Sequence, residues 1–556
     1  MNVLIIGGVA AGMSAAARLR RLDEQARIVV LERDGYVSFA NCGLPYHIGG
    51  SIPNREQLLV VTPEHLRGTL NLDVRTRHEA LMIDRERRRV TVLNRQTGQQ
   101  YQETYDVLVL AQGAEPLRPP VPGVDLPQIM TLRTLDDMDR IVAAIDSGVR
   151  SAVVIGASYI GIEMVEALRQ RGLRVDLVEL QEQVMPLLDP EIAAALAEEL
   201  SAHAVALHLG VAARTFAPEG GGLRVDLSDG SALCADLVVL AVGVRPASAL
   251  ACAAGLALGP RGGIAVDPQM RTSDPHIYAA GDMVEVTDTV TGEAAVIALA
   301  GPANRQGRII ADAICGRASA YRSTQGTAIV KLFGRCAATT GASEKALRRT
   351  GRDYHKVYLH PSSHAGYYPG AQPMQIKLLF APEDGRLLGA QIAGGEGVDK
   401  RIDVLATALR AGMSVFDLEH LELAYAPPYG SAKDPVNMAG FVAANLLRGD
   451  VAFWYAEQID TRGPALLVDV RDPQEYLQGH IAGATNIPLT HLRRHTAELA
   501  ALDRPIWLYC AVGFRSYLAY RILRQCGATE VLTLAGGMRT FSATHGQRQP
   551  LAFGLH

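Results

Sequence analysis

The sequence has no CxxC pair, and its cysteine count of seven is odd. Both features argue against a framework of disulfides and against a structural zinc site. We therefore expect a reduced compartment, no bound metal, and cysteines that are mostly buried and unreactive.

Long apolar runs and a strong excess of charge are also missing. No stretch is apolar for long enough to span a bilayer, and glycines interrupt the apolar start, which no basic segment precedes. We expect this start to form a strand, a turn and a helix rather than a signal peptide, and we place the protein in the cytoplasm without a membrane partner. The net charge of -4 argues against nucleic acid as the main partner. A length of 556 residues predicts about two to four domains.

A first glycine-rich turn, Gly7 to Gly12, follows the apolar residues 3–6. It predicts a helix whose free N–H groups bind a pyrophosphate, while Glu32, about 20 residues on, accepts hydrogen bonds from a ribose. Val9 replaces the middle glycine of the usual pattern, so an ordinary strand–turn–helix unit is the alternative. FAD is favoured by the strand that ends at Gly113 and by Gly281-Asp282, which is similar to a flavoprotein motif for the ribityl chain. The expected FAD contacts are Gly7, Val9, Ala10, Gly12, Glu32, Gly113, Gly281 and Asp282.

A second turn of the same kind, Gly156 to Gly161, follows the apolar residues 152–155, with Ser158 in place of the middle glycine. The next strand ends at Glu179, whose carboxylate suits a 2′-hydroxyl and repels a 2′-phosphate. The repeated motif predicts a second nucleotide, NADH in preference to NADPH. Its expected contacts are Gly156, Ser158, Tyr159, Gly161, Glu179 and Gly243.

Cys42 lies shortly after Glu32, in the segment Ser38–Tyr46. A single thiolate beside a flavin can attack an external disulfide or persulfide sulfur. Gly43 and Pro45 indicate a shaped loop that is open to a ligand; the alternative is a buried thiol in an irregular loop.

The C-terminal segment resembles a rhodanese domain in its residues 466–472, 479–488 and 506–515. Here a strand delivers Cys510 to the start of a helix, and Gly513 lets the backbone N–H groups curl around the sulfur. We expect the helix dipole and Arg515 to stabilise a persulfide anion on Cys510. A rhodanese domain without activity is the alternative, and Cys526 is expected to serve packing.

The motifs GGVAAGMSAAARLRR, SFANCGLPY, GPANRQGR and AYAPPYGSAKDPVN make residues 1 to about 445 similar to the coenzyme A-disulfide reductases. These are a single-cysteine branch of the pyridine nucleotide–disulfide oxidoreductases, and the rhodanese tail resembles the fused, persulfide-reducing form. The resemblance implies that coenzyme A binds near Cys42, and that Tyr367 and Tyr425 reach the active cysteine of a partner subunit in a homodimer. It implies a coenzyme A site made by Ser14, Arg18, Arg21, Ser38, Asn41, Arg75, Asn304 and Lys433.

The predicted fold class is α/β, with two Rossmann-like nucleotide-binding domains, an α+β dimerisation domain and an α/β rhodanese domain. The expected boundaries are 1–150 with 255–325 for FAD, 151–254 for NADH, 326–447 for dimerisation and 455–556 for the rhodanese domain.

The expected function is NADH-dependent reduction, through FAD and Cys42, of coenzyme A persulfide, polysulfide or disulfide, with sulfur transfer at Cys510. One alternative is an NADH oxidase or peroxidase in which Cys42 cycles through a sulfenic acid. Another is a sulfur carrier or redox sensor whose flavin is only structural. Cys510 and Cys42 together suggest a sulfur relay.

Overall fold

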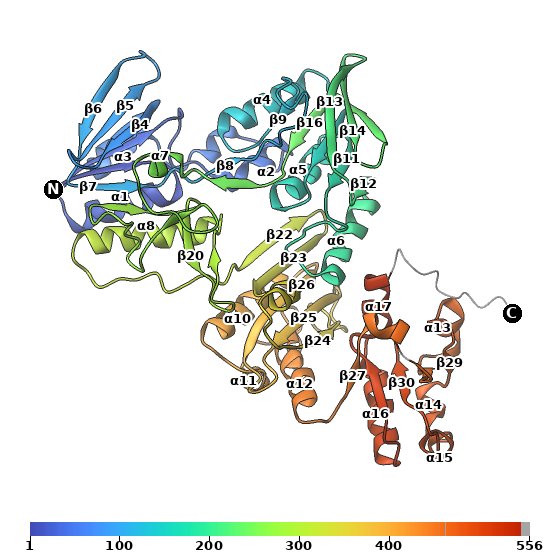
Figure 1. Ribbon diagram of the computed structural model, residues 1–556. Helices are drawn as coiled ribbons and strands as arrows, with labels where there is room; N and C mark the ends of the chain where they lie inside the picture. Colours follow the sequence, from blue (N-terminus) through green and yellow to red (C-terminus); the bar gives the residue numbers. More distant parts are fainter. Residues whose placement is uncertain (462, 546–556) are drawn as a thin grey trace. The chain divides into compact units, whose positions relative to one another are not determined.

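The computed structural model describes residues 1–461 and 463–545, and these residues fall into two units. Residues 1–182 and 203–326 form the first unit; residues 183–202 join the described residues from 327 onward in the second. Figure 1 shows the elements with their labels. The last part of the expected rhodanese domain, residues 546–556, lies outside the described residues.

Two five-stranded parallel sheets form the core of the first unit, in the orders β19-β7-β1-β2-β3 and β12-β11-β10-β16-β9. Their central strands are almost entirely apolar because helices cover both faces, as in doubly wound folds. The strands are β1 (Asn2–Ile6), β2 (Arg27–Glu32), β3 (Asp73–Thr76), β7 (Val107–Leu110), β9 (Ile129–Met130), β10 (Ser151–Ile155), β11 (Arg174–Glu179), β12 (Ala206–Leu209), β16 (Leu237–Leu240) and β19 (Ile277–Ala279).

Smaller sheets complete the first unit. They are made by β4 (His78–Asp84), β5 (Arg89–Asn94) and β6 (Gln100–Thr104); β13 (Ala213–Glu219), β14 (Gly222–Leu227) and β15 (Ala232–Ala235); β8 (Ala114–Pro116) and β17 (Val244–Pro246); and β18 (Ile264–Ala265), β20 (Val284–Thr287) and β21 (Ala294–Ala295).

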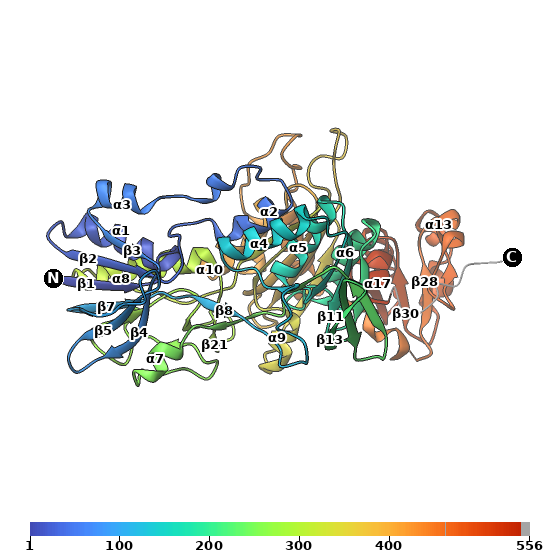
Figure 2. The ribbon, with the colours of Figure 1, turned by 90° about the horizontal axis from the view of Figure 1, so that it is seen from above.

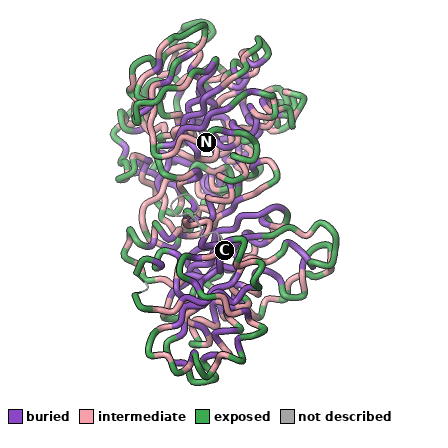
Figure 3. Tube along the Cα trace, turned by 90° about the vertical axis from the view of Figure 1, so that its right-hand side faces the viewer, coloured by how far each residue is buried: buried purple, intermediate pink, exposed green. Residues whose placement is uncertain are grey.

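Helices of the first unit cover its sheets, and α1 lies beside α8 (Figure 2). They are α1 (Ala10–Leu22), α2 (Leu44–Ile48), α3 (Pro63–Leu70), α4 (Leu135–Asp146), α5 (Tyr159–Gln170), α7 (Ala249–Ala253) and α8 (Ala300–Ile314), with 3-10 turns η1 (Asn41–Gly43) and η2 (Arg55–Leu58). Figure 3 colours the trace by burial and shows that buried segments lie mostly inside the fold and exposed segments mostly at its edges.

The second unit contains an antiparallel sheet of order β22-β23-β26-β25-β24 and a parallel sheet of order β27-β31-β30-β28-β29. The first sheet consists of β22 (Ala328–Leu332), β23 (Arg335–Gly341), β24 (His355–Leu359), β25 (Met374–Phe380) and β26 (Leu387–Gly394), with α6 (Pro190–Ala202), α9 (Glu344–Arg349), α10 (Val398–Arg410), α11 (Val415–Glu419) and α12 (Pro435–Leu447). The second consists of β27 (Phe453–Trp454), β28 (Leu466–Asp469), β29 (Thr485–Asn486), β30 (Ile506–Tyr509) and β31 (Val531–Leu534), with η3 (Ala456–Thr461), α13 (Pro473–Gln478), α14 (Leu489–Leu492), α15 (Thr496–Ala500), α16 (Phe514–Gln525) and α17 (Gly537–His545).

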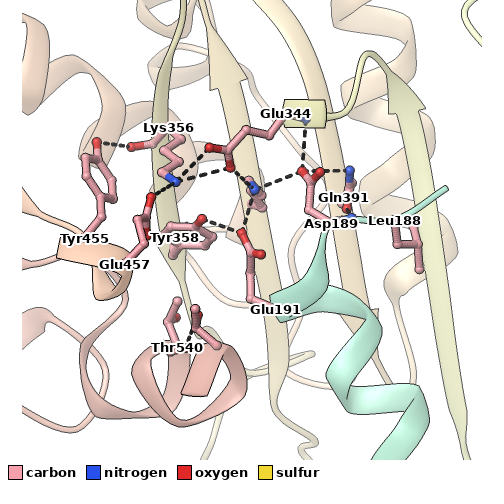
Figure 4. A network of polar contacts seen from close by, with 12 residues as sticks. Leu188, Asp189, Glu191, Glu344, Lys356, Tyr358, Gln391, Tyr455, Glu457 and Thr540 are labelled. Carbon is pink, nitrogen blue, oxygen red and sulfur yellow. Dashed lines mark hydrogen bonds and ion pairs between the residues drawn. The ribbon is translucent and has the colours of Figure 1, made fainter. Parts of the chain in front are cut away.

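A buried charge cluster joins α6 to the antiparallel sheet (Figure 4). Lys377 of β25 is fully buried, and its Nζ lies 2.9 Å from Asp189, 2.5 Å from Glu191 and 2.6 Å from Glu344. Although burial opposes it, Lys377 and Lys356 lower the pKa of Glu344 to about 2. We expected α6 to belong to the NADH-binding domain. Instead, α6 belongs to the second unit, where these ion pairs hold it on the antiparallel sheet.

The start of the rhodanese-like part is attached to the same cluster. Lys356 Nζ lies 2.9 Å from Glu344 and 2.5 Å from Glu457, and Tyr455 donates a hydrogen bond to the Lys356 carbonyl at 2.9 Å. Both partners of Lys356 carry negative charge, so this lysine links the antiparallel sheet to η3.

None of the helices in the described part of the chain has both the length and the apolar character needed to cross a membrane.

We predict that Lys377→Met lowers the free energy of unfolding by about 3–5 kcal/mol, because it leaves the carboxylates of Asp189, Glu191 and Glu344 buried without their cation. Calorimetric unfolding of the full chain measures this as a lower transition temperature of the second unit. Lys345→Met, at an exposed position of α9, is the matched control and is expected to change the value by less than about 0.5 kcal/mol. Equal stability of the two variants would contradict the role of the cluster.

Candidate active site

The first glycine-rich turn lies between β1 and α1. Gly7 has a φ of 107°, and an added Cβ at Gly12 would lie 1.9 Å from the Gly7 oxygen, so the helix packs closely on the strand. Glu32 accepts a hydrogen bond from the Gly8 amide at 2.8 Å, and burial raises the pKa of Glu32. Helix α1 begins after Val9, and no described side chain caps it, which leaves its first amides available to a pyrophosphate.

The groups around this turn fit a flavin dinucleotide. Gly113 and Gly281 both have positive φ, at 73° and 85°. Arg133 donates to the Asp282 carboxylate at 3.2 Å, and the buried Gln112 Oε1 has no hydrogen-bond partner among the described residues. The amides of α1, Glu32 and Asp282 would hold FAD.

The second turn repeats this geometry between β10 and α5. Gly156 has a φ of 101°, and a Cβ added at Gly161 would lie 1.9 Å from the carbonyl oxygen of Gly156. Glu179 accepts a hydrogen bond at 2.7 Å from the amide that follows Gly156. Ser158 precedes α5 without capping it, and Gly243 has a φ of 109°. The repeat supports a second nucleotide site of the same type.

Cys42 lies in η1, between β2 and α2, and is exposed. Ser38 has a φ of 47°, and Asn41 Nδ2 donates to the Arg133 carbonyl at 3.2 Å. The expected irregular loop is instead helical, because Gly43 ends η1 and Pro45 lies in the first turn of α2. A Cβ at Gly43 would lie 2.6 Å from a Leu58 methyl group, which explains the glycine. The thiol is therefore open to a ligand, as expected.

The charges around Cys42 oppose loss of its proton. Burial raises the pKa of the thiol, and the carboxylates of Glu163 and Asp282 raise it further, while Arg133 lowers it. Because a thiolate is the reactive form, these groups favour the protonated thiol, and Arg133 opposes them.

Glu163 is a site residue that the sequence reasoning missed. Burial raises its pKa to about 7, and the Tyr46 hydroxyl donates to it at 3.3 Å. It lies on α5 one turn after Tyr159, whose pKa burial raises to about 12. An acidic residue in this otherwise apolar helix start was the signal that could have identified it.

A pocket of about 660 Å³ leads to Cys42 from the face formed by α1 and α8. Most of the expected coenzyme A residues line it, together with Arg308, which the sequence reasoning missed although it follows Asn304 by one helical turn. The expected residues in the lining are Ser14, Arg18, Arg21, Ser38, Asn41 and Asn304.

Three arginines line the pocket, and one of them, Arg18, is held by a carboxylate. Arg18 donates to Asp312 at 2.8 Å, and Ser14 donates to the Asn304 side chain. Arg75 is absent from the described lining; its guanidinium instead pairs with Asp73 and Glu103, at 2.5 and 2.7 Å. Arg75 of β3 therefore does not belong to the described lining of the pocket, contrary to the expectation.

Tyr367, Tyr425 and Lys433 belong to the second unit, and all three are exposed. The hydroxyls of Tyr367 and Tyr425 lie 3.0 Å apart, and this hydrogen bond raises the pKa of Tyr367. The two tyrosines predicted as a pair are therefore neighbours.

Cys510 follows β30 and is fully buried. Gly513, with a φ of 98°, turns its amide toward the sulfur at 3.2 Å, which is one of the N–H groups expected around Cys510. Arg515 is bound by Glu475 through hydrogen bonds of 2.6 and 2.8 Å, so its charge is already paired. Sequence reasoning assigned that charge to a persulfide and missed Glu475.

The expectation that most cysteines are buried is wrong. Of the seven, Cys510 alone is buried, while Cys42, Cys234, Cys252 and Cys526 are exposed. Cys526 caps the C-terminal end of α16 rather than packing inside it.

The sequence model of the pyridine nucleotide-disulphide oxidoreductases matches residues 1–307, and that of their dimerisation domain matches residues 327–434. The model of the rhodanese-like domain matches residues 452–544. Together these matches agree with the predicted order of domains.

The chain is similar along most of its length to three characterised or solved proteins. It is 35% identical over 447 residues to the coenzyme A disulfide reductase of Staphylococcus haemolyticus, covering 80% of this chain and 100% of the relative. The reduced CoADR-RHD of Bacillus anthracis is 46% identical, with a TM-score of 0.96 and 98% coverage of both chains. The NAD-dependent persulfide reductase of A. fulgidus is 37% identical, with a TM-score of 0.92 and coverage of 97% and 100%.

We predict that Glu163→Gln lowers the pKa of Cys42, because it removes a negative charge that disfavours the thiolate. The pH dependence of Cys42 alkylation by iodoacetamide measures the shift, which is expected to be downward. Glu166→Gln, one helical turn further along α5, is the control and is expected to produce a smaller shift. A Cys42 pKa that stays the same or rises in Glu163→Gln would show that the two groups do not interact as described.

Proposed function

The chain belongs to the pyridine nucleotide-disulphide oxidoreductases, and from this premise we propose that it reduces coenzyme A persulfide or coenzyme A disulfide with NADH. It is an NAD(P)H-dependent flavoprotein reductase with a rhodanese-like domain. The observation that carries the substrate proposal is the pocket that joins arginine side chains to the exposed Cys42 thiol.

The pocket matches the chemistry of coenzyme A. Arginines bind phosphates through charge-assisted hydrogen bonds, and Arg21 and Arg308 supply two guanidinium groups, while Arg18 beside them is paired with Asp312. Apolar residues of the same lining, such as Met13 and Leu66, suit the uncharged arm that carries the thiol. We therefore place the nucleotide at the arginines and the reacting sulfur at Cys42.

The proposed reaction uses Cys42 as a nucleophile. Its thiolate attacks a sulfur of coenzyme A disulfide, forms a mixed disulfide and releases one coenzyme A thiolate. With coenzyme A persulfide, the same mixed disulfide forms and hydrosulfide leaves. FAD, held by the amides of α1, Glu32 and Asp282, would supply the two electrons of NADH that reduce the mixed disulfide. Its reduction releases coenzyme A and leaves the Cys42 thiolate.

Protons for the released sulfur are proposed to come from hydroxyl groups. Tyr46 and Glu163 hold a proton next to Cys42, and the pKa of Glu163 of about 7 suits proton exchange at neutral pH. Tyr367 and Tyr425 are proposed to donate to the leaving sulfur of a partner subunit, with Lys433 near the substrate. This arrangement requires a homodimer, which fits the matched dimerisation domain.

NADH is proposed in preference to NADPH, because the Glu179 carboxylate would repel a 2′-phosphate. At the other sulfur site, Cys510 is proposed to accept sulfane sulfur and pass it on to coenzyme A. The Gly513 amide, which points at the Cys510 sulfur, supports a persulfide at that position.

We expect Cys42→Ser to reduce turnover of coenzyme A disulfide by on the order of a thousandfold, because serine is a far weaker nucleophile at neutral pH. NADH consumption measures the rate, and the visible absorbance of bound flavin shows that the cofactor is retained. Cys252→Ser, at another exposed thiol of the first unit, should keep full activity. Turnover by Cys42→Ser close to the unchanged protein would overturn the assignment.

Arg308→Gln is expected to raise KM for coenzyme A disulfide by about tenfold, because one charge-assisted phosphate contact is lost. Pantethine, which lacks the nucleotide phosphates, should show the same KM with and without the substitution. Arg305→Gln, on the same helix but outside the pocket lining, provides the matched control. An equal effect on both disulfides would refute phosphate binding by Arg308.

A further inference from the structure

The sulfur loop of the rhodanese-like domain rests on the first turn of α17. The Met538 and Arg539 amides donate to the carbonyls of Cys510 and Ala511, at 2.8 and 3.0 Å. A Cβ added at Gly537 would lie 2.6 Å from the Cys510 oxygen. The helix start is thus in direct contact with the loop and fixes two of its peptide groups.

These two hydrogen bonds fix the Cys510–Ala511 and Ala511–Val512 peptide groups of the loop. The next peptide carries the Gly513 amide, which points at the Cys510 sulfur at 3.2 Å. Amides in this arrangement stabilise negative charge on sulfur only while the loop keeps its shape.

The opposite side of the same helix turn contacts the antiparallel sheet. His360, which follows β24, forms a hydrogen bond of 2.9 Å between its Nε2 and the Thr540 hydroxyl. A Cβ added at Gly536 would lie 2.7 Å from the Tyr358 Cβ, so the helix start is pressed against the strand. Tyr358 is fixed in turn by its hydroxyl, which donates to Glu191 of α6 (Figure 4).

We infer that His360 is a positioning residue for sulfur transfer at Cys510, acting through Thr540 and the first turn of α17. This inference rests on the proposed sulfur transfer by the rhodanese-like domain. Burial and the nearby Arg539 lower the pKa of His360 to about 3, so its ring is neutral and the bond to Thr540 persists at physiological pH. The sulfur site is therefore completed by a residue that lies outside the rhodanese-like domain.

Transfer from thiosulfate to cyanide tests this inference on the full chain. The Cys510 thiolate attacks the outer sulfur of thiosulfate, an S–S bond forms, and sulfite leaves. Cyanide then takes the outer sulfur as thiocyanate and restores the thiolate. We expect His360→Phe, which keeps an aromatic ring but cannot bond Thr540, to lower kcat about fivefold with KM unchanged.

Further variants separate positioning from loss of fold. Thr540→Val removes the same hydrogen bond and is expected to match His360→Phe, and the double variant should be no slower than either single variant. His360→Gln can still bond Thr540 and should recover most of the rate. His355→Phe, at the other end of β24, is the control and should remain within about twofold of the unchanged chain.

The possible contrary results distinguish a failure of the inference about His360 from a failure of the proposed sulfur transfer. Unchanged kcat in His360→Phe, or no recovery in His360→Gln, would overturn the inference while leaving the proposed sulfur transfer intact. A full chain that makes no thiocyanate through Cys510 would overturn the proposed transfer and the inference together. Reduction of bound flavin by NADH should be equal in all variants, because the nucleotide turns lie in the first unit.

Discussion

A thiol must lose its proton before it attacks sulfur, and the surroundings of Cys42 oppose that loss. Burial and the carboxylates of Glu163 and Asp282 raise the pKa of Cys42, with Arg133 as the opposing charge. The same unit supplies a pocket lined by Cys42 and by arginine side chains, and a glycine-rich turn suited to a flavin.

Buried charge plays a different role in the second unit. Lys377 compensates three carboxylates and holds α6 on the antiparallel sheet, while Lys356 attaches the start of the rhodanese-like part. Removing one member of such a cluster costs far more than the whole cluster contributes. The cluster therefore fixes where elements from distant parts of the sequence meet.

Local patterns were predictable from the sequence, and long-range contacts were not. The turns at Gly7 and Gly156 and the loop of Cys510 depend on neighbouring residues, so their geometry was predicted. The place of α6 depends on partners some 150 residues or more away in sequence. Arg75 shows the same limit, since its pairing with Glu103 keeps it from the pocket.

The missed residues have a common cause as well. Glu163 and Arg308 belong to helices whose sequence pattern marks the apolar face, and only the fold shows what their polar side chains face. Glu475 could not be paired with Arg515 from sequence, because the two lie 40 residues apart. The expectation of buried cysteines failed for a similar reason, since residue type alone does not say whether a position faces the core; Cys252 lies on α7 and Cys526 at the end of α16, and both are exposed.

The most direct test of the central claim is mass analysis of the protein after exposure to coenzyme A disulfide without NADH, followed by mapping of the modified peptide. The account predicts one coenzyme A per chain, joined to Cys42 and released by NADH. A protein that carries coenzyme A on another cysteine, or that carries none, would contradict it.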